Sequence, residues 1–299
     1  MFKIKLKAKN TLSAVELNKD EVLEFTLLNH QVVRIEILET KAEIFQTTLK
    51  EILKPEKGAI TNYRFWLHFK VNGVSATIER EVSTQKSFYE PFLIEGVYIW
   101  LDAVKDIFAF LLETHGDCKP KKDVRLALLD ASLGRICPEI LHPWCPLPEG
   151  TLNIKDCFRG EDCWLGAYDG VDAHGGLDIN HPRGTPLWAP FDIHDHYYFN
   201  SIAAGHNNNR WRGVHRFSNG AEWVIQSHHQ ITLLVDEHTP FKKGRHYSDG
   251  AGVWVGRHDH THFVFKIYDC GELTLLDPWI LFWQMYRDQK VSKSENLSE

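Results

Sequence analysis

Residues 174–189 read His-Gly-Gly-Leu-Asp-Ile-Asn-His-Pro-Arg-Gly-Thr-Pro-Leu-Trp-Ala. This stretch places an imidazole, His174, four residues before a carboxylate, Asp178. Two glycines lie between them, and glycine permits unusual backbone angles and a close approach of neighbouring groups. Histidine and aspartate are both zinc ligands, so the two side chains can bind one ion if the chain bends here. Taken alone this spacing is a weak signal, because a zinc site needs at least one further ligand.

A second pattern, His258-Asp-His260-Thr-His262, continues into Phe263-Val-Phe-Lys-Ile267, which is typical of a β-strand. Residues two apart on a strand project from the same face, so His260 and His262 are expected to point into one site. A register shift that puts His258 in place of His260 is the alternative. Two histidines and one carboxylate form a known catalytic zinc set, which leaves a fourth position for water. A metal lowers the pKa of that water, and a second imidazole can act as a base.

Histidine is concentrated in the second half of the chain. Only four of the 17 histidines lie outside the segment from His174 to His262. Dense histidine is typical of sites that bind metals or move protons near neutral pH. Several of the clustered histidines nevertheless lie in loop-like sequence, and we expect these to be solvated: His181, His194, His196, His206 and His215.

Together the two patterns resemble the motifs of the lysostaphin-type zinc metallopeptidases, over about residues 150–285. The stretch from His174 to Asp178 is similar to the first motif of that family, HxGxD. The segment His260-Thr-His262-Phe263 resembles the second motif, HxHF. Three weaker similarities are the strand Trp223–His228 that ends in histidine, the glycine turn at Gly271, and the helix start at Leu276-Asp-Pro-Trp279.

This resemblance implies a compact antiparallel β fold with zinc in an open groove, bound by His174, Asp178 and His262. It also implies that His260 acts in catalysis with a second histidine, and the family spacing selects His238 for that role. Three other histidines compete with it: His228, His229 and His246. The implied activity is hydrolysis of peptide bonds, usually those of bacterial peptidoglycan in this family. The expected partner is therefore a peptide or peptidoglycan, in the cell envelope or outside the cell.

Two departures from the family pattern favour an alternative function. Val264 stands where the family often has glutamate, and Gly250-Ala-Gly252 only partly replaces the glycine turn that precedes the HxH pair. The alternative is a catalytically degenerate, zinc-containing module that binds a peptide or a glycan. A third interpretation is a cupin-like metal oxygenase or isomerase. That class needs a glutamate shortly after the HxH pair, and none occurs before Glu272.

The whole chain is predicted to be mainly β, with an antiparallel β-sheet peptidase domain after a smaller β-rich domain that contains one helix. A proline-rich stretch at 137–150 separates the domains, which we place at 1–145 and 150–288, with a disordered tail at 289–299. Hydrophobic residues three and four apart predict the helix at 99–113, and Asn72-Gly73 predicts a hairpin. The segment Ile193–Gly220 is expected to be a loop. The expected strands are Val22–Leu28, Val32–Leu38, Tyr63–Val71, Ser75–Arg80, Val124–Leu129, Pro186–Ala189, Glu222–Gln226, Ile231–Val235, Gly252–Val255 and His262–Tyr268, and a closing helix is expected at Asp277–Arg287.

Composition limits the function further. With 299 residues, 43% hydrophobic and 25% charged, the chain is long enough for two folded domains. A formal net charge of −6 argues against nucleic acid as a partner, because phosphate binding needs a concentrated basic face.

No segment reaches the roughly 18 apolar residues that span a membrane, and the N-terminus lacks the apolar core of a secretory signal. The six cysteines include no CxxC pair, which argues against a thiolate zinc site.

Overall fold

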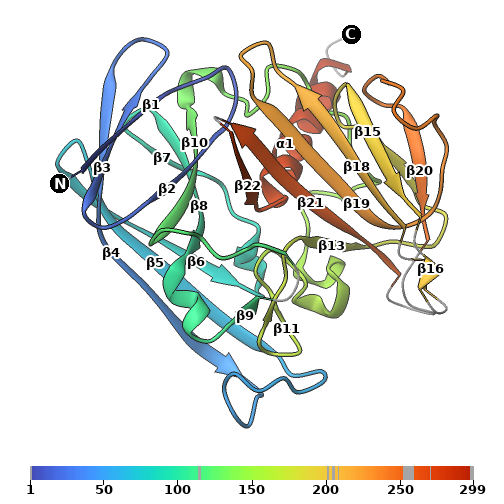
Figure 1. Ribbon diagram of the computed structural model, residues 1–299, viewed down its shortest axis with the longest axis horizontal. Coiled ribbons are helices and arrows are strands. Elements are labelled where there is room, and N and C mark those ends of the chain that lie inside the picture. The colour runs from blue at the N-terminus through green and yellow to red at the C-terminus, as the bar shows by residue number, and fades with distance from the viewer. Residues whose placement is uncertain are drawn as a thin grey trace. The chain divides into compact units, whose positions relative to one another are not determined.

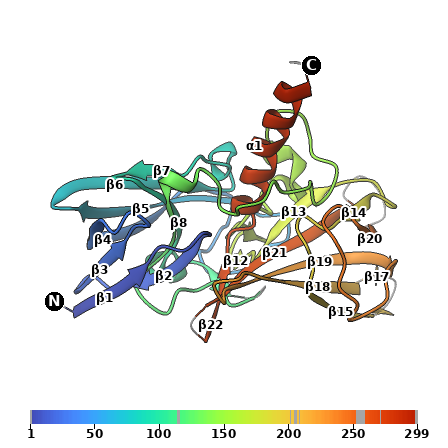
Figure 2. The same ribbon diagram turned by 90° about the horizontal axis from the view of Figure 1, so that it is seen from above.

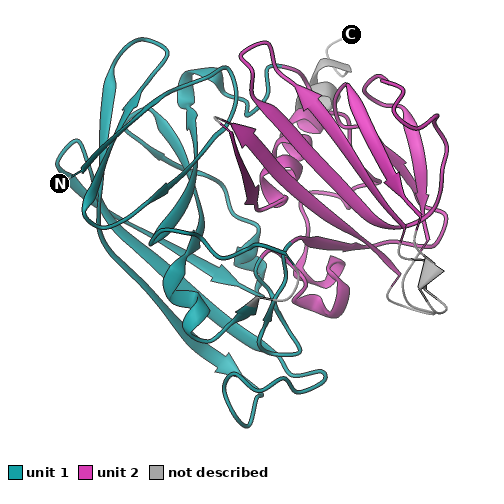
Figure 3. Cartoon of the chain, viewed as in Figure 1, with its two compact units in different colours: residues 1–138, 165–175 teal, residues 139–164, 176–299 magenta. Residues whose placement is uncertain are grey.

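The computed structural model describes residues 2–113, 116–200, 202–203, 206–207, 209–251, 259–269 and 271–296. Strands dominate these residues, and nearly all neighbouring strands run antiparallel (Figure 1). This confirms the predicted mainly β, antiparallel class. The chain divides into two compact units, one of residues 1–138 and 165–175 and the other of residues 139–164 and 176–299 (Figure 3). The domain limits 1–145 and 150–288 stay a prediction.

Unit 1 contains a five-stranded sheet in the order β1-β3-β4-β5-β6. Its strands are β1 (Phe2–Lys7), β3 (Glu21–Thr26), β4 (Val32–Thr47), β5 (Thr61–Val71) and β6 (Val74–Val82). Every second side chain of β5 is buried, from Tyr63 to Val71, so one face of this sheet lies against the core. Asn72 and Gly73 both have positive φ, the backbone of a type I′ turn, which confirms the predicted hairpin.

The second sheet of unit 1 overturns the predicted helix at 99–113. Its order is β2-β10-β8-β7, with β2 (Ser13–Leu17), β10 (Val124–Asp130), β8 (Val97–Val104) and β7 (Phe92–Ile94). Residues up to Val104 therefore form a strand, and only a 3-10 turn at Lys105–Ala109 follows. β8 is buried on both faces, so its side chains are almost all apolar, and such a run also satisfies helical spacing.

Several short elements complete the described chain. A three-stranded sheet of unit 1 joins β11 (Ala167–Tyr168), β12 (Asp172–Ala173) and β9 (Leu112–Glu113), and a small pair in unit 2 joins β16 (Ile202–Ala203) and β17 (His206–Asn207). The 3-10 helices are η1 (Gln85–Ser87), η2 (Lys105–Ala109), η3 (Ala131–Leu133), η4 (Ile154–Asp156) and η5 (Phe158–Gly160).

Unit 2 is built on an eight-stranded sheet with the main order β13-β21-β19-β18-β15. These strands are β13 (Leu177–Asn180), β21 (His260–Asp269), β19 (Glu222–Leu233), β18 (Asn209–Arg216) and β15 (Asp195–Phe199). β22 (Glu272–Leu276) pairs with β21, and β20 (His246–Gly250) pairs with β19 and with β14 (Pro186–Trp188). The loop predicted at 193–220 is wrong, because this segment contributes β15 and β18.

Two strands were predicted at Glu222–Gln226 and Ile231–Val235. The structure has one continuous strand there, β19, which ends at Leu233. The strands predicted at Pro186–Ala189 and His262–Tyr268 are confirmed by β14 and β21. The strand predicted at Gly252–Val255 lies outside the described residues.

One face of this sheet forms the core of unit 2 against α1 (Trp279–Asn296). Phe263 of β21 lies 5.2 Å from Phe282 of α1 and 4.6 Å from Trp144, measured between ring centroids. Figure 2 places α1 to one side of β21, β19 and β18. Because neighbouring residues of a strand face opposite sides, His260 and His262 project from the face away from α1.

The closing helix predicted at Asp277–Arg287 is confirmed by α1, but α1 continues to Asn296. The disordered tail at 289–299 stays a prediction. Within the described part of the chain, no helix has the length and apolar character needed to cross a membrane.

Candidate metal centre

The pairing of β13 with β21 brings predicted ligands together. In this antiparallel pair Asp178 lies opposite His262, and Asn180 lies opposite His260. His262 Nδ1 is 2.7 Å from Asp178 Oδ1, and His260 Nε2 is 3.3 Å from Asp178 Oδ2. One buried carboxylate thus faces both histidines of the HxH pattern, as expected for two residues on the same side of a strand.

His174 completes the group of candidate ligands. Among the described residues, one set of histidine, cysteine and acidic side chains could hold a metal ion: His174, Asp178 and His262 have potential ligand atoms within 4.8 Å of one another. All three are buried, at 3%, 4% and 8% exposure. Ligand atoms of a tetrahedral zinc site lie about 3.3 Å apart, since each bond is about 2 Å long. The donor set of two imidazoles and one carboxylate suits zinc, and the ligand atoms would have to move closer together than the 4.8 Å limit to bind one ion.

Gly176 allows the close approach that the ligand group requires. An ideal Cβ at this position would lie 2.4 Å from His262 Cε1, 2.6 Å from His262 Nε2 and 2.6 Å from the carbonyl oxygen of Phe263. Any side chain at residue 176 would therefore displace either the His262 ring or strand β21. The glycine predicted to permit close approach does so, and the atom it accommodates belongs to a candidate ligand.

Two adjacent histidines of β19 lie beside the ligand group. The His228 ring is 4.8 Å from the His262 ring, and the His229 ring is 5.0 Å from the His260 ring, between centroids. Adjacent residues of a regular strand would point to opposite faces. His229, however, has a φ of 64°, and the pairing register shifts just after it, so β19 is locally kinked. This kink lets both rings reach the same cluster.

Burial keeps these two imidazoles neutral. Burial is the main cause that lowers the pKa of His228 well below its ordinary value, and the neighbouring His262 adds to the effect. Burial, with a contribution from His260, lowers the pKa of His229 to about 2. His229 Nδ1 is a buried ring nitrogen that makes no hydrogen bond within the described structure. Buried polar atoms nearly always have partners, so this nitrogen is available to a ligand.

His260 is held between an aromatic ring and the carboxylate. Its ring stacks on Phe158 at 4.1 Å between centroids with an interplanar angle of 27°. With 3% exposure, it is enclosed on one side while His229 and Asp178 face it on others. This arrangement fixes the orientation of the imidazole and keeps Nε2 close to the ligand group.

The other histidines weighed for the second catalytic role lie in different surroundings. His238 has a side chain that is 65% exposed, 3.6 Å from Asp195 and near the ring of Tyr197. His246 contacts Asp249 at 2.7 Å. No contact with the ligand group is seen for either within the described residues. The role of His238 stays a prediction from spacing, and the alternative with His258 lies outside the described residues.

Several histidines expected to be solvated are buried instead. His196 and His215 are 1% and 7% exposed, and His215 Nδ1 lies 2.7 Å from the backbone oxygen of Asp192. His181 contacts the Thr261 hydroxyl, and burial lowers its pKa. His194 is exposed, as expected. For His196 and His215 the loop interpretation of 193–220 caused the error, because these two residues lie in strands β15 and β18 and are buried there.

Comparison with known proteins identifies no family directly, since no protein-family model and no curated protein matches the chain. Solved structures do match. The antimicrobial peptidase lysostaphin from Staphylococcus simulans is 16% identical, covering 48% of this chain and 50% of that chain, with a TM-score of 0.32. Its catalytic domain alone is 16% identical over 46% of this chain and 86% of that chain, with a TM-score of 0.27. A zinc-containing peptidase from Vibrio cholerae is 11% identical, and the match covers 88% of this chain and 83% of that chain, with a TM-score of 0.33.

All three matched structures are peptidases. The match spans about half the length of the full lysostaphin chain.

Proposed function

We propose that this chain is a zinc-dependent metalloendopeptidase that hydrolyses peptide bonds, in peptidoglycan or in glycine-rich peptides. The observation that supports this most directly is the convergence of buried His174, Asp178 and His262 on one point. Peptidoglycan as substrate would place the reaction in the cell envelope or outside the cell.

His174, Asp178 and His262 are the proposed zinc ligands. A bound zinc ion supplies Lewis-acid chemistry, which lowers the pKa of a coordinated water and polarises a peptide carbonyl. The carboxylate of Asp178 offsets part of the metal charge and orients both histidines that face it. Gly176 keeps the His262 ring in place by leaving room for it.

His260 and His229 are the proposed pair of catalytic imidazoles. His260, whose ring is oriented by stacking on Phe158, takes a proton from the attacking water and passes it to the leaving amine. His229 is neutral, so it donates a ring N–H to the carbonyl oxygen as negative charge develops there. His229 replaces the sequence choice of His238 in this proposal because its ring lies 5.0 Å from that of His260.

Metal analysis tests the ligand assignment. The purified full chain, loaded with zinc and then desalted, is expected to retain one zinc per chain. Asp178→Ala is expected to lose it, whereas Asn180→Ala, two residues further along β13, is expected to keep it. Equal zinc retention by Asp178→Ala and the native chain contradicts the assignment.

Hydrolysis of glycine-rich peptides and of peptidoglycan fragments tests catalysis itself. The expected result is turnover that His260→Ala abolishes while zinc stays bound, with a loss of at least about 100-fold for a general base. His229→Ala is expected to reduce kcat more than His238→Ala does. Zinc retention with no turnover on any of these substrates would instead favour the catalytically degenerate binding module.

A further inference from the structure

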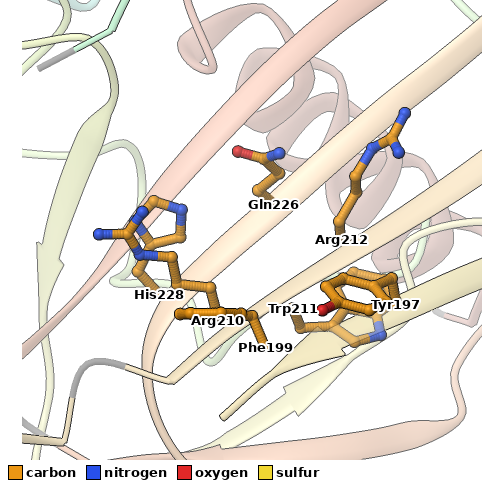
Figure 4. A pocket seen from close by; sticks show the side chains of 7 residues that line it. All are labelled: Tyr197, Phe199, Arg210, Trp211, Arg212, Gln226 and His228. Carbon is orange, nitrogen blue, oxygen red and sulfur yellow. The ribbon is translucent and has the colours of Figure 1, made fainter. Parts of the chain in front are cut away.

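A pocket lies on the same sheet face as the metal centre. It has a volume of about 320 Å³ and is lined by Tyr197, Phe199, Arg210, Trp211, Arg212, Gln226 and His228 (Figure 4). All seven residues belong to β15, β18 and β19 of unit 2. His228, the pocket residue nearest to the candidate ligands, has its ring 4.8 Å from that of His262. The pocket therefore borders the metal centre.

Strand register connects the pocket to the metal centre in one row. Phe199 pairs with Arg210, Arg210 with His228, His228 with His262, and His262 with Asp178. Neighbouring strands of a sheet lie about 4.8 Å apart, so the Cα of Arg210 lies about 10 Å from that of His262. An extended peptide advances about 3.4 Å per residue, so about two or three residues span that distance.

The pocket carries uncompensated positive charge. Arg210 and Arg212 are both exposed, and within the described residues no carboxylate pairs with either. Arg216 on the same strand differs, because Glu222 lies 2.8 Å and Asp195 3.8 Å from its guanidinium. In Figure 4, Arg210 stands beside His228 and Arg212 beside Tyr197. Figure 4 shows the two guanidinium groups pointing away from one another, so each offers its own N–H donors, and carboxylates are preferred small partners of a guanidinium group.

The walls of the pocket suit a peptide more than a small free anion. Tyr197 and Phe199 are 48% and 49% exposed, so both present aromatic surface to the pocket. Large exposed aromatic side chains beside charged donors are typical of binding sites, where they pack against the apolar part of a ligand. The side chain that carries the carboxylate would lie against these rings.

We propose that this pocket is a substrate subsite for a carboxylate, so that the preferred substrate is an acidic peptide whose carboxylate lies about two or three residues from the cleaved bond. Arg210 and Arg212 provide the positive charge that attracts the carboxylate, and Tyr197 and Phe199 contact the carbon chain that carries it. This inference rests on the proposed peptidase function for the position of the cleaved bond. It does not rest on that function for the binding of the carboxylate.

Matched peptides test the subsite on the zinc-loaded full chain. One glutamate is placed at each position in turn of an amidated hexaglycine peptide, and each peptide has a twin with glutamine at that position. Both kcat/KM and, with chelator-treated protein, Kd by fluorescence anisotropy are measured. A further pair, hexaglycine with a terminal acid or amide, distinguishes a chain-terminal carboxylate from a side-chain carboxylate.

The expected result is a preference of about tenfold for glutamate over glutamine at one or two positions, as charge-assisted hydrogen bonds at exposed arginines would give. Arg210→Gln and Arg212→Gln are each expected to reduce that preference to less than about threefold, with unchanged zinc content and circular dichroism. Arg216→Gln removes the same charge from the same strand and is expected to leave the preference intact. Preference only for the terminal acid, lost in the same two variants, assigns the subsite to a chain terminus.

Two outcomes separate this inference from the proposed function. If peptides are cleaved but no twin pair differs by more than about twofold, the subsite is overturned and the peptidase stands. If no peptide is cleaved, the Kd values of the glutamate and glutamine twins test the subsite. Tighter binding of a glutamate peptide that is lost in Arg210→Gln supports the subsite without the peptidase. Equal Kd values for all twin pairs overturn the subsite.

Discussion

Gly176→Ala is the substitution whose effect on the metal centre follows most directly from the structure. The added Cβ would lie 2.4 Å from His262 Cε1, and ordinary contacts begin at 3.4 Å, so the ring must move by about 1.0 Å. Metal–ligand distances tolerate only about 0.2 Å. We therefore expect zinc affinity to fall by about 10–100-fold or more, the range typical when the support of a ligand is lost.

The assay is competition with a chelator of known affinity, followed by thermal unfolding with and without zinc. Overpacking alone is expected to cost about 1–3 kcal/mol of unfolding free energy in the zinc-free protein. Gly184→Ala is the control, because Gly184 has a φ of 84° but no atom within 4 Å of an added Cβ. It is expected to cost about 1 kcal/mol through backbone strain and to leave zinc affinity unchanged.

The decisive comparison is the zinc affinity of the two alanine variants. If Gly176→Ala binds zinc as tightly as the native chain, the His262 ring is not a ligand in the position described. If both variants lose zinc equally, the loss reflects general destabilisation and not the contact with His262. Either result would refute the steric argument.

Three further predictions concern pH and stability. Zinc affinity is expected to fall as the pH is lowered, because the coordinating imidazoles must be deprotonated, and a chelator titration that gives the same affinity at about pH 5 and about pH 8 would contradict this. Tyr247→Phe removes the hydroxyl that accepts the Trp144 indole N–H at 2.8 Å, and leaving that buried donor unpaired should cost about 1–3 kcal/mol in urea unfolding. Asp102→Ala removes the carboxylate 2.6 Å from Nε of the buried Arg125, and calorimetry should show a loss of about 3–5 kcal/mol.

The ligand group could be predicted from sequence because its chemistry and its spacing agree. Only a few residue types bind zinc, and a strand period of two places His260 and His262 on one face, as β21 does. The glycines next to His174 were expected to allow close approach, and Gly176 has no room for a Cβ. The roles of these residues remain proposals.

The second histidine could not be chosen from sequence because a backbone kink decides it. His229 reaches His260 through a left-handed φ of 64°, which no side-chain pattern in the neighbourhood indicates. Spacing along the chain favoured His238, which the structure places at an exposed position beside Asp195.

The two mistakes in secondary structure have different physical reasons. β8 is apolar on both faces, so its composition fits a buried helix as well as a strand. In β18 the alternation was present but unusual, because exposed Arg210 and Arg212 alternate with buried Trp211 and Gly213. Charge and aromatic content in that stretch resembled a loop, and the pocket arginines were missed for the same reason.

The candidate ligands and the pocket residues come from different strands. The candidate ligands come from β13, β21 and the residue His174 that precedes them, whereas the arginines come from β18 and the exposed aromatics from β15. If the proposed function and subsite hold, a lineage could exchange Arg210 or Arg212 and acquire a new cleavage preference while the ligand residues at the other end of the row stay unchanged. Directed evolution limited to β15 and β18 would then change the substrate preference of the protein.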